Sequence, residues 1–359
     1  MKFIYLSRRS NKSGFFILDH LLRNTAHIPD AVVLPAGAGR EIHQKLEKIS
    51  EPAGSLLELQ ILERSPCNSI EGLCSEFDIP VIEVSDINTP EGLLRFQSAS
   101  PDLLVLGGGW PQLLSREVYT CAPLGVINTH PSLLPHYRGT DVHRWQIYEG
   151  VKVSGTTIHY VDANFDTGNI LAQCAITVGL GETPQQLAMR AGLVAGPLME
   201  RVLQNISETP PNLVESEQQD QTVSRESYFS RWPWENREFL AIRWKEPNYK
   251  ILQLILASTQ EDARYNGPYF RVDGKDVIVR RASIVDRENG PLVEPGEVVM
   301  LDAAGLVVAC GQGMLRLEVL QEMTSFWPGG SNTSPPVFGY EFCLENKIST
   351  GSSLQEGSY

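Results

Sequence analysis

The sequence lacks the long apolar run that a membrane-spanning helix needs. Such a helix takes about 20 consecutive apolar residues, and no stretch of these 359 residues approaches that length. The apolar part of the N-terminus, Phe3 to Leu6, is too short for a secretory signal peptide and is not followed by a small-residue cleavage site. We therefore expect no membrane association and a cytoplasmic location.

Cysteine is sparse, and no cysteines lie at a paired spacing. The six cysteines are scattered and form no C-x-x-C pair, which favours reduced thiols over a disulfide framework or a zinc site. The histidines His136, His143 and His159 show no metal-ligand spacing with His130. The sequence therefore predicts no metal cofactor.

Positive charge and two common catalytic motifs are also in short supply. The 30 lysine and arginine residues face 43 aspartate and glutamate residues, for a formal net charge of −13. A chain with this charge repels nucleic acid unless its basic residues gather on one surface. Neither a G-x-G-x-x-G fingerprint nor a G-x-S-x-G nucleophile elbow is present. Nicotinamide-dependent chemistry and covalent serine catalysis are therefore disfavoured.

What the sequence does contain is an alternation of short apolar strands and amphipathic helices up to residue 206. This pattern is typical of an α/β domain of the Rossmann-like, doubly wound class with a parallel sheet. We also expect a helix at residues 41–49. The predicted strands lie at residues 3–6, 31–35, 80–84, 102–106, 124–130, 155–162 and 170–178.

The pattern changes after residue 206. Residues 207–238 are polar and proline-bearing, then aromatic, and predict a linker lying over the surface. Residues 239–323 contain short strands separated by turns, including the hairpin signal Asp273-Gly274, and predict a small OB-like β-barrel. The tail, residues 324–359, is rich in serine, glycine and proline and is predicted to be flexible. The predicted catalytic domain is therefore residues 1–206.

Three polar residues follow the predicted strands at places that suit catalysis. Asn128 and His130 are two residues apart at the end of an apolar strand, so their side chains share one face. The loop after the next strand can return Asp166 towards His130. An amide, an imidazole and a carboxylate at strand ends are sufficient for proton transfer at a carbonyl. A lone histidine is more often structural, but this spacing and position favour a functional role.

A longer motif surrounds these residues. The stretch from Asn128 to Pro135, followed by Tyr137-Arg138-Gly139 and then by Val161 through Gly168, resembles the signature of the 10-formyltetrahydrofolate-dependent formyltransferases. That family includes glycinamide ribonucleotide, methionyl-tRNA and nucleotide-amino-sugar formyltransferases. The resemblance covers about residues 80–206 and extends into the predicted barrel. There, residues 242–244, 270–275, 295–296 and 305–311 look like the second domain of the methionyl-tRNA enzymes.

The resemblance implies a reaction, a folate pocket and an acceptor site. An amine would attack the formyl carbon of 10-formyltetrahydrofolate while Asn128 and protonated His130 hold the oxyanion and Asp166 assists His130 and proton removal. The implied folate pocket consists of Leu106, Gly107, Gly108, Gly109, Ser132, Leu133, Leu134, Pro135, Val161, Asp162 and Phe165. The residues expected at the acceptor are Arg8, Arg9, Asn11, Arg138 and Gly139.

The sequence leaves the acceptor amine open. The net charge and the glutamates between residues 41 and 63, where a basic loop is expected in tRNA enzymes, disfavour tRNA. The stretch from Tyr228 to Arg231 looks more like the sugar enzymes. We therefore expect a small or nucleotide-linked amine, with the barrel as a scaffold or in a homodimer. Methionyl-tRNA formyltransferase, formyltetrahydrofolate hydrolase and a non-catalytic folate- or RNA-binding module are the alternatives.

Overall fold

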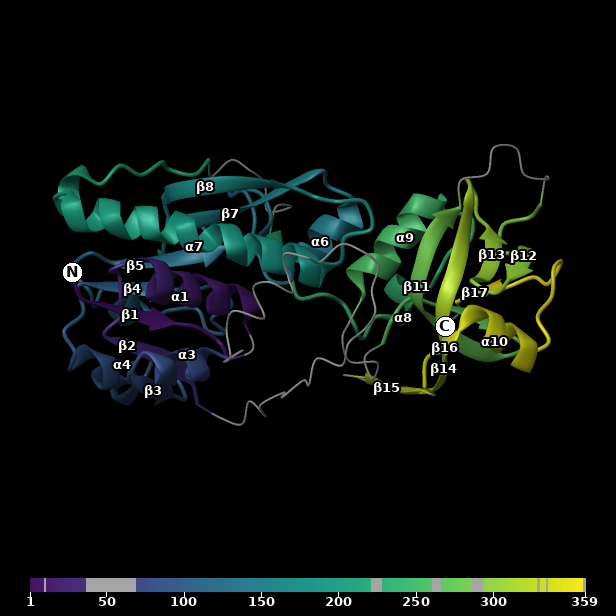
Figure 1. The fold of residues 1–359 in the computed structure, drawn as a ribbon, viewed down its shortest axis with the longest axis horizontal. Coiled ribbons are helices and arrows are strands. Elements are labelled where there is room, and N and C mark those ends of the chain that lie inside the picture. Colours follow the sequence, from purple (N-terminus) through teal and green to yellow (C-terminus); the bar gives the residue numbers. More distant parts are fainter. Residues whose placement is uncertain are drawn as a thin grey trace. The chain divides into compact units, whose positions relative to one another are not determined.

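The computed structural model describes residues 1–9, 11–36, 69–220, 228–259, 266–285, 293–327, 330–333 and 335–357, and the predicted helix at 41–49 lies outside them. The chain forms two compact units (Figure 1). The first unit comprises Met1–Gly139, Val153–Thr177 and Ala188–Tyr228, and the second comprises Thr140–Lys152, Val178–Leu187 and Phe229–Tyr359. This division differs from the predicted boundaries, because two segments before residue 206 belong to the second unit. In the described part of the chain, no helix is long and apolar enough to span a membrane.

The first unit is built on a seven-stranded sheet in the order β3-β2-β1-β4-β5-β7-β8. Strands β1 to β5 run parallel, as predicted, whereas β7 is antiparallel to both of its neighbours, β5 and β8. β7 and β8 pair antiparallel because residues 161–169, which connect them, are too few for the crossover of a dozen or more residues that parallel strands need. The strands are β1 (Phe3–Leu6), β2 (Ala31–Pro35), β3 (Val81–Val84), β4 (Leu103–Leu106), β5 (Val126–His130), β7 (Val153–Tyr160) and β8 (Ile170–Thr177).

Helices cover both faces of this sheet. Successive strand residues point to opposite faces, so Tyr5 and Val105 pack against α1, α3 and α7, whereas Ile4 and Leu104 pack on the side of α4 and α5. This arrangement is the doubly wound architecture that the sequence predicted. The helices are α1 (Lys12–Asn24), α3 (Ile70–Glu76), α4 (Pro90–Gln97), α5 (Arg116–Tyr119) and α7 (Pro184–Glu208), and η1 (Pro211–Leu213) is a 3₁₀ turn.

The order of the strands reverses between β1 and β4. From β1 the chain moves outward to β2 and β3, and it later returns to β4 and β5 on the other side of β1. Open α/β sheets bind ligands at the carboxyl ends of the strands at such a point. Asn11 links the two loops there, because its Oδ1 accepts the Gly14 N–H and its Nδ2 donates to the Gly108 carbonyl. Gly109 has φ 67°, and a side chain at this residue would overlap the Asn11 amide.

The second unit contains an antiparallel sheet in the order β12-β13-β14-β11-β10-β17, with β15 and β16 paired to β14. The predicted hairpin joins β10 and β11, and its turn residues Asp273 and Gly274 have φ 47° and 78°. These positive angles match the twist of a two-residue hairpin. The strands are β10 (Tyr269–Val272), β11 (Lys275–Val285), β12 (Val298–Asp302), β13 (Gly305–Ala309), β14 (Met314–Trp327), β15 (Gly330–Thr333), β16 (Val337–Phe338) and β17 (Gln355–Glu356).

The C-terminal residues pack more tightly than the sequence predicted. Helix α10 (Gly339–Glu345) buries Phe342 and Cys343 in the core of the second unit, and Ile348 and Leu354 join them. The Leu354 N–H also donates to the Gly296 carbonyl at 2.8 Å, which joins the segment before β17 to the segment before β12 and curls the sheet. The prediction of a flexible tail is therefore wrong for residues 335–357.

Helix α6 (Val142–Glu149) packs within the second unit together with the predicted aromatic linker. Arg144 donates to the carbonyl of Ala257 at 2.6 Å, at the end of α9. The Trp145 ring lies 4.8 Å from the ring of Trp232, which is 1% exposed. The aromatic residues therefore form core of this unit. The remaining elements are β6 (Arg138–Gly139), β9 (Tyr228–Phe229), α8 (Arg237–Leu240) and α9 (Asn248–Ala257).

Candidate active site

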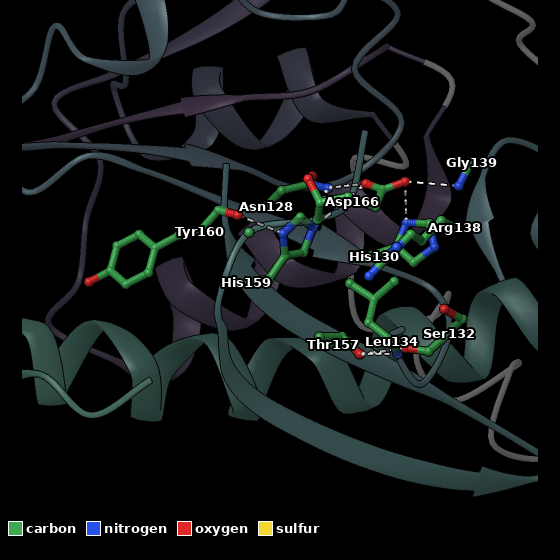
Figure 2. A network of polar contacts seen from close by, with 12 residues as sticks. Asn128, His130, Ser132, Leu134, Arg138, Gly139, Thr157, His159, Tyr160 and Asp166 are labelled. Atoms are coloured by element: carbon green, nitrogen blue, oxygen red, sulfur yellow. Dashed lines mark hydrogen bonds and ion pairs between the residues drawn. The ribbon is translucent and has the colours of Figure 1, made fainter. Parts of the chain in front are cut away.

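Strand β5 carries two of the predicted site residues at its carboxyl end. Asn128 and His130 project towards Asp166, as Figure 2 shows. In the neighbouring strand β7, His159 lies opposite Asn128 and Thr157 lies opposite His130. The side chain of His130 is 4% exposed. The polar end of an otherwise apolar strand is therefore enclosed by a second polar strand.

Asp166 reaches this pair from the loop between β7 and β8. Its Oδ2 lies 3.4 Å from His130 Nδ1 and accepts the Gly139 N–H at 2.9 Å. Its Oδ1 lies 3.5 Å from Asn128 Nδ2. The structure thus brings together the three residues that the sequence predicted to converge (Figure 2), while their catalytic roles stay predictions.

The contacts of His130 determine which of its nitrogens can exchange a proton. His130 Nε2 lies 2.6 Å from the Tyr137 carbonyl oxygen. A carbonyl can only accept a hydrogen bond, so Nε2 carries a hydrogen in both the neutral and the charged ring. Proton exchange therefore occurs at Nδ1, the nitrogen that faces Asp166.

His159 also belongs to the site, although its spacing in the sequence indicated only that it is no metal ligand together with His130. Its Nδ1 donates to the Tyr160 carbonyl at 2.7 Å, and its Nε2 accepts from Asn128 Nδ2 at 3.1 Å. Burial lowers the pKa of His159, and His130 lowers it further, against the opposing charge of Asp166. A neutral His159 thus orients the Asn128 amide with its NH₂ group inward. The signal that could have revealed His159 is the spacing of Thr157 and His159, which lie two residues apart on β7 and therefore on the same face, opposite His130 and Asn128.

The predicted folate loop, Ser132 to Pro135, is fixed beside His130 by hydrogen bonds of its own. The Leu134 N–H donates to Thr157 Oγ1 at 3.1 Å, and the Leu134 carbonyl accepts from Gln173 at 2.8 Å. Ser132 Oγ donates to the His136 carbonyl at 2.7 Å. Leu133 packs over Gly155, where a side chain would overlap it. The loop therefore has one well-defined backbone path next to the site.

Other predicted folate residues lie in the loop that carries Asp166. The Val161 N–H donates to the Val126 carbonyl at 2.8 Å, and Asp162 Oδ1 accepts from Thr167 Oγ1 at 2.6 Å. Phe165 is 46% exposed. Its ring centroid lies 6.2 Å from that of Tyr228, which is 45% exposed. An exposed aromatic pair thus stands one residue away from Asp166. Leu106 and Gly107 to Gly109 lie at the end of β4, as predicted.

The predicted acceptor residues divide into one exposed arginine and several that already have partners. Arg8 is exposed, whereas Arg9 pairs with Glu71 at 2.6 Å and with Glu83. Arg138 is 7% exposed, and its Nε and Nη2 donate to Gln219 Oε1 at 3.2 and 2.7 Å. Gly139 N–H and the Asn11 side chain are engaged within the site, as described above. Binding of the acceptor by these residues stays a prediction. No group of residues in the described ranges could hold a metal ion.

Comparison with known proteins agrees with this geometry. Residues 81–203 match the formyl transferase family, and residues 236–326 match the formyl transferase, C-terminal domain family. The methionyl-tRNA formyltransferase of Syntrophus aciditrophicus (strain SB) is 31% identical over 280 residues, which cover 78% of this chain and 82% of that protein. The chain belongs to the formyltransferase family. This membership confirms the predicted family and its class of enzyme, formyl-group transferases.

Solved structures of other formyltransferases and of HypX share the fold. WlaRD, a sugar 3N-formyl transferase solved in the presence of dTDP and 5-N-formyl-THF, gives a TM-score of 0.56 at 16% identity over 91% of this chain and 99% of WlaRD. HypX from Aquifex aeolicus, in complex with tetrahydrofolic acid, gives 0.56 at 14% identity over 100% of this chain and 51% of HypX. The chain thus spans about half the length of HypX. These likenesses confirm the predicted fold class.

Proposed function

We propose that this formyltransferase moves the formyl group of 10-formyltetrahydrofolate to the primary amine of a small or nucleotide-linked acceptor. The observation that carries the proposal is the convergence of Asn128, His130 and Asp166 at the end of β5, beside the point where the strand order reverses. An amide donor, an imidazole and a carboxylate are the groups that amine attack on a formyl carbon requires.

The chemistry follows from the atoms that the three residues present to the formyl group and the amine. Attack by the amine on the formyl carbon produces a negative oxygen and a positive nitrogen. Protonated His130 donates a hydrogen bond from Nδ1 to that oxygen. Asn128 donates through the Nδ2 hydrogen that faces Asp166, because Nδ2 lies 3.5 Å from Asp166 Oδ1 and only 3.1 Å from His159 Nε2. Asp166 accepts the proton that the attacking nitrogen loses. Collapse re-forms the C=O bond of the formyl group and breaks the bond to the folate nitrogen, which takes up the proton that Asp166 had accepted.

The folate donor is supported by the loops around the site. The glycine loop after β4 and the loop from Ser132 to Pro135 lie at the carboxyl ends of neighbouring strands, where α/β sheets bind ligands. WlaRD and HypX, which share the fold, were solved with reduced folates. In this proposal the loops hold the donor with its formyl carbon against His130 and Asn128.

The proposed class of acceptor rests on charge and on the exposed aromatic pair. In the second unit, Arg237 and Arg271 both contact Asp276, and Arg281 pairs with Glu318. A surface that binds tRNA needs cations free to face phosphates, and carboxylates neutralise these three. Phe165 and Tyr228 offer aromatic faces beside Asp166, on which the flat ring of a nucleotide-linked amine can stack.

Methionyl-tRNA formyltransferase is the second candidate, and the sequence relatives support it. Besides the relative at 31% identity, the corresponding enzyme of Geobacter metallireducens is 29% identical over 252 residues. Both candidates share the donor and the three site residues. They differ in the acceptor alone.

The test is to supply 10-formyltetrahydrofolate with one amine at a time and to follow the release of tetrahydrofolate. The amines are a set of nucleotide-linked amino sugars, a set of small amines, and charged methionyl-tRNA, and mass spectrometry detects the added formyl group. We expect release only with a nucleotide-linked or small amine. Formylation of methionyl-tRNA, with binding that weakens steeply as salt rises, would establish the second candidate. Release without any amine would show a hydrolase and contradict both.

A further inference from the structure

Gln219 is a buried polar residue in the segment that the sequence predicted to be a surface linker. The residue is 3% exposed. Glu217 exchanges N–H···O bonds of 2.7 and 2.8 Å with Ile170, and Asn169 donates to Ser216 Oγ at 3.2 Å. The linker therefore crosses the loop that carries Asp166 and places Gln219 against it.

The side-chain amide of Gln219 uses both of its ends. Its Nε2 donates to the main-chain oxygens of Asp166 at 3.0 Å and Gly168 at 2.7 Å. Its Oε1 accepts both hydrogen bonds from the Arg138 guanidinium described above. A guanidinium can only donate and a carbonyl can only accept, so the partners themselves determine which end of the amide faces which way.

These contacts close a ring around the Asp166 carboxylate. Gln219 holds the side chain of Arg138, and the next residue, Gly139, donates its N–H to Asp166 Oδ2 at 2.9 Å. Gln219 therefore fixes the main chain of Asp166 directly, and it fixes the donor to the Asp166 carboxylate through Arg138. Asp166 has φ 55°, a conformation that residues other than glycine adopt rarely and that surrounding contacts must maintain.

We propose that Gln219 is a positioning residue for formyl transfer, which holds the Asp166 carboxylate beside His130, where it can accept the proton that the attacking amine loses. The inference rests on the proposed function, because it matters only if Asp166 and His130 act in the reaction. Misplacing a catalytic group by about 1 Å lowers a rate by about 100-fold. The carboxylate already lies 3.4 Å from His130 Nδ1, so a further shift would break this contact.

Two substitutions separate the roles of the two ends of the amide. Gln219→Met removes all four hydrogen bonds at nearly constant volume. Gln219→Glu keeps an acceptor for Arg138 but places an oxygen against the carbonyls of Asp166 and Gly168. The matched control is Gln218→Met, because Gln218 is the preceding residue of the same segment and is exposed. Thermal unfolding of each variant checks that the assay temperature lies below its transition.

We expect kcat to fall about 10- to 100-fold in both Gln219 variants. The KM values for donor and amine should stay within about twofold of those of the original protein. Neither kcat nor KM should change in Gln218→Met. A general loss of structure would not produce this split. The second measurement repeats Gln219→Met in an Asp166→Asn protein. If Gln219 acts through Asp166, the added substitution lowers the residual rate no further.

Three results would overturn the inference. One is a Gln219→Glu protein with unchanged kcat, which decides the question even if Gln219→Met does not fold. Another is a rise in KM for the donor or the amine with kcat unchanged. The third is an equal loss of rate from Gln219→Met with and without the Asp166 carboxylate. Full turnover by Asp166→Asn alone is a different result, because it contradicts the proposed function on which the inference rests.

Discussion

Asp166 in the first unit and Asp276 in the second are equally buried but differ completely in their partners. Their side chains are 12% and 13% exposed. Asp276 accepts from Arg237 Nη2 at 2.6 Å and from Arg271 Nε at 2.9 Å. The partners of Asp166 are the Gly139 N–H at 2.9 Å, Asn128 Nδ2 at 3.5 Å and two imidazole nitrogens at 3.4 and 3.7 Å.

The difference shows what separates a structural carboxylate from one that can handle protons. A guanidinium does not give up its proton in a protein, so the two arginines hold Asp276 charged and fixed. An imidazole exchanges protons near neutral pH, and the longer distances leave Asp166 room to accept a new partner. Burial alone does not distinguish the two aspartates. The chemistry of their neighbours does.

The largest effect that this comparison predicts is on activity. Asp166→Asn should lower the rate of formyl transfer about 1,000-fold, because the amide cannot accept the proton that general base catalysis requires. Asp276→Asn should leave the rate within about twofold. Both rates are measured as tetrahydrofolate release under saturating substrates, at a temperature where both variants are folded. A large loss of activity in Asp276→Asn would break the comparison.

The sequence predicted the first unit better than the second for a physical reason. In the strand predicted at residues 102–106, residues 103–106 are continuously hydrophobic, and they form β4 in the middle of the sheet. The C-terminal residues Phe342, Cys343, Ile348 and Leu354 are isolated apolar positions in a stretch rich in serine and glycine. They are buried in the core of the second unit by segments far away in the sequence, as when Leu354 donates to the carbonyl of Gly296, about 60 residues earlier, and no local pattern reveals such contacts.

The residues of the site also fall into those that a local pattern predicted and those that only the tertiary structure reveals. The spacing of Asn128 and His130 predicted their shared face, because the period of a strand is local. His159 and Gln219 could not be assigned from their own neighbourhoods. His159 meets Asn128 through the register of two antiparallel strands, and Gln219 meets Asp166 across 53 residues of chain. Both relations are set by tertiary structure, and both residues contact the predicted ones without being part of the recognised motif.

Stability should show the reverse of the activity result. Asp276→Asn leaves two neighbouring guanidinium groups without their carboxylate, and since both arginines are partly exposed the cost should be about 1–2 kcal/mol. Asp166→Asn should change the free energy of unfolding by less than about 1 kcal/mol, because its partners in the described part of the chain are an N–H group, an amide and two imidazoles rather than guanidinium groups. Urea denaturation followed by tryptophan fluorescence measures this, since five of the six tryptophans lie in the second unit. For Asp166, far-ultraviolet circular dichroism reports on both units.

The smallest predicted effect concerns His159. Because its ring is neutral, it does not form a fixed ion pair with Asp166 as the two arginines do with Asp276. Burial lowers the pKa of folded His159 below the value of about 6.5 in an unfolded chain. Protonation therefore favours the unfolded state, so stability is intact above about pH 6.5 and falls as the pH drops towards the folded pKa. His159→Gln removes this titration, and its unfolding midpoint should decline less between pH 7 and 5. The other histidines are common to both proteins, so they contribute equally to both declines. Equal declines of the two midpoints would mean that the pKa of His159 does not change on folding. The assignment of a neutral ring to His159 next to Asp166 would then be wrong.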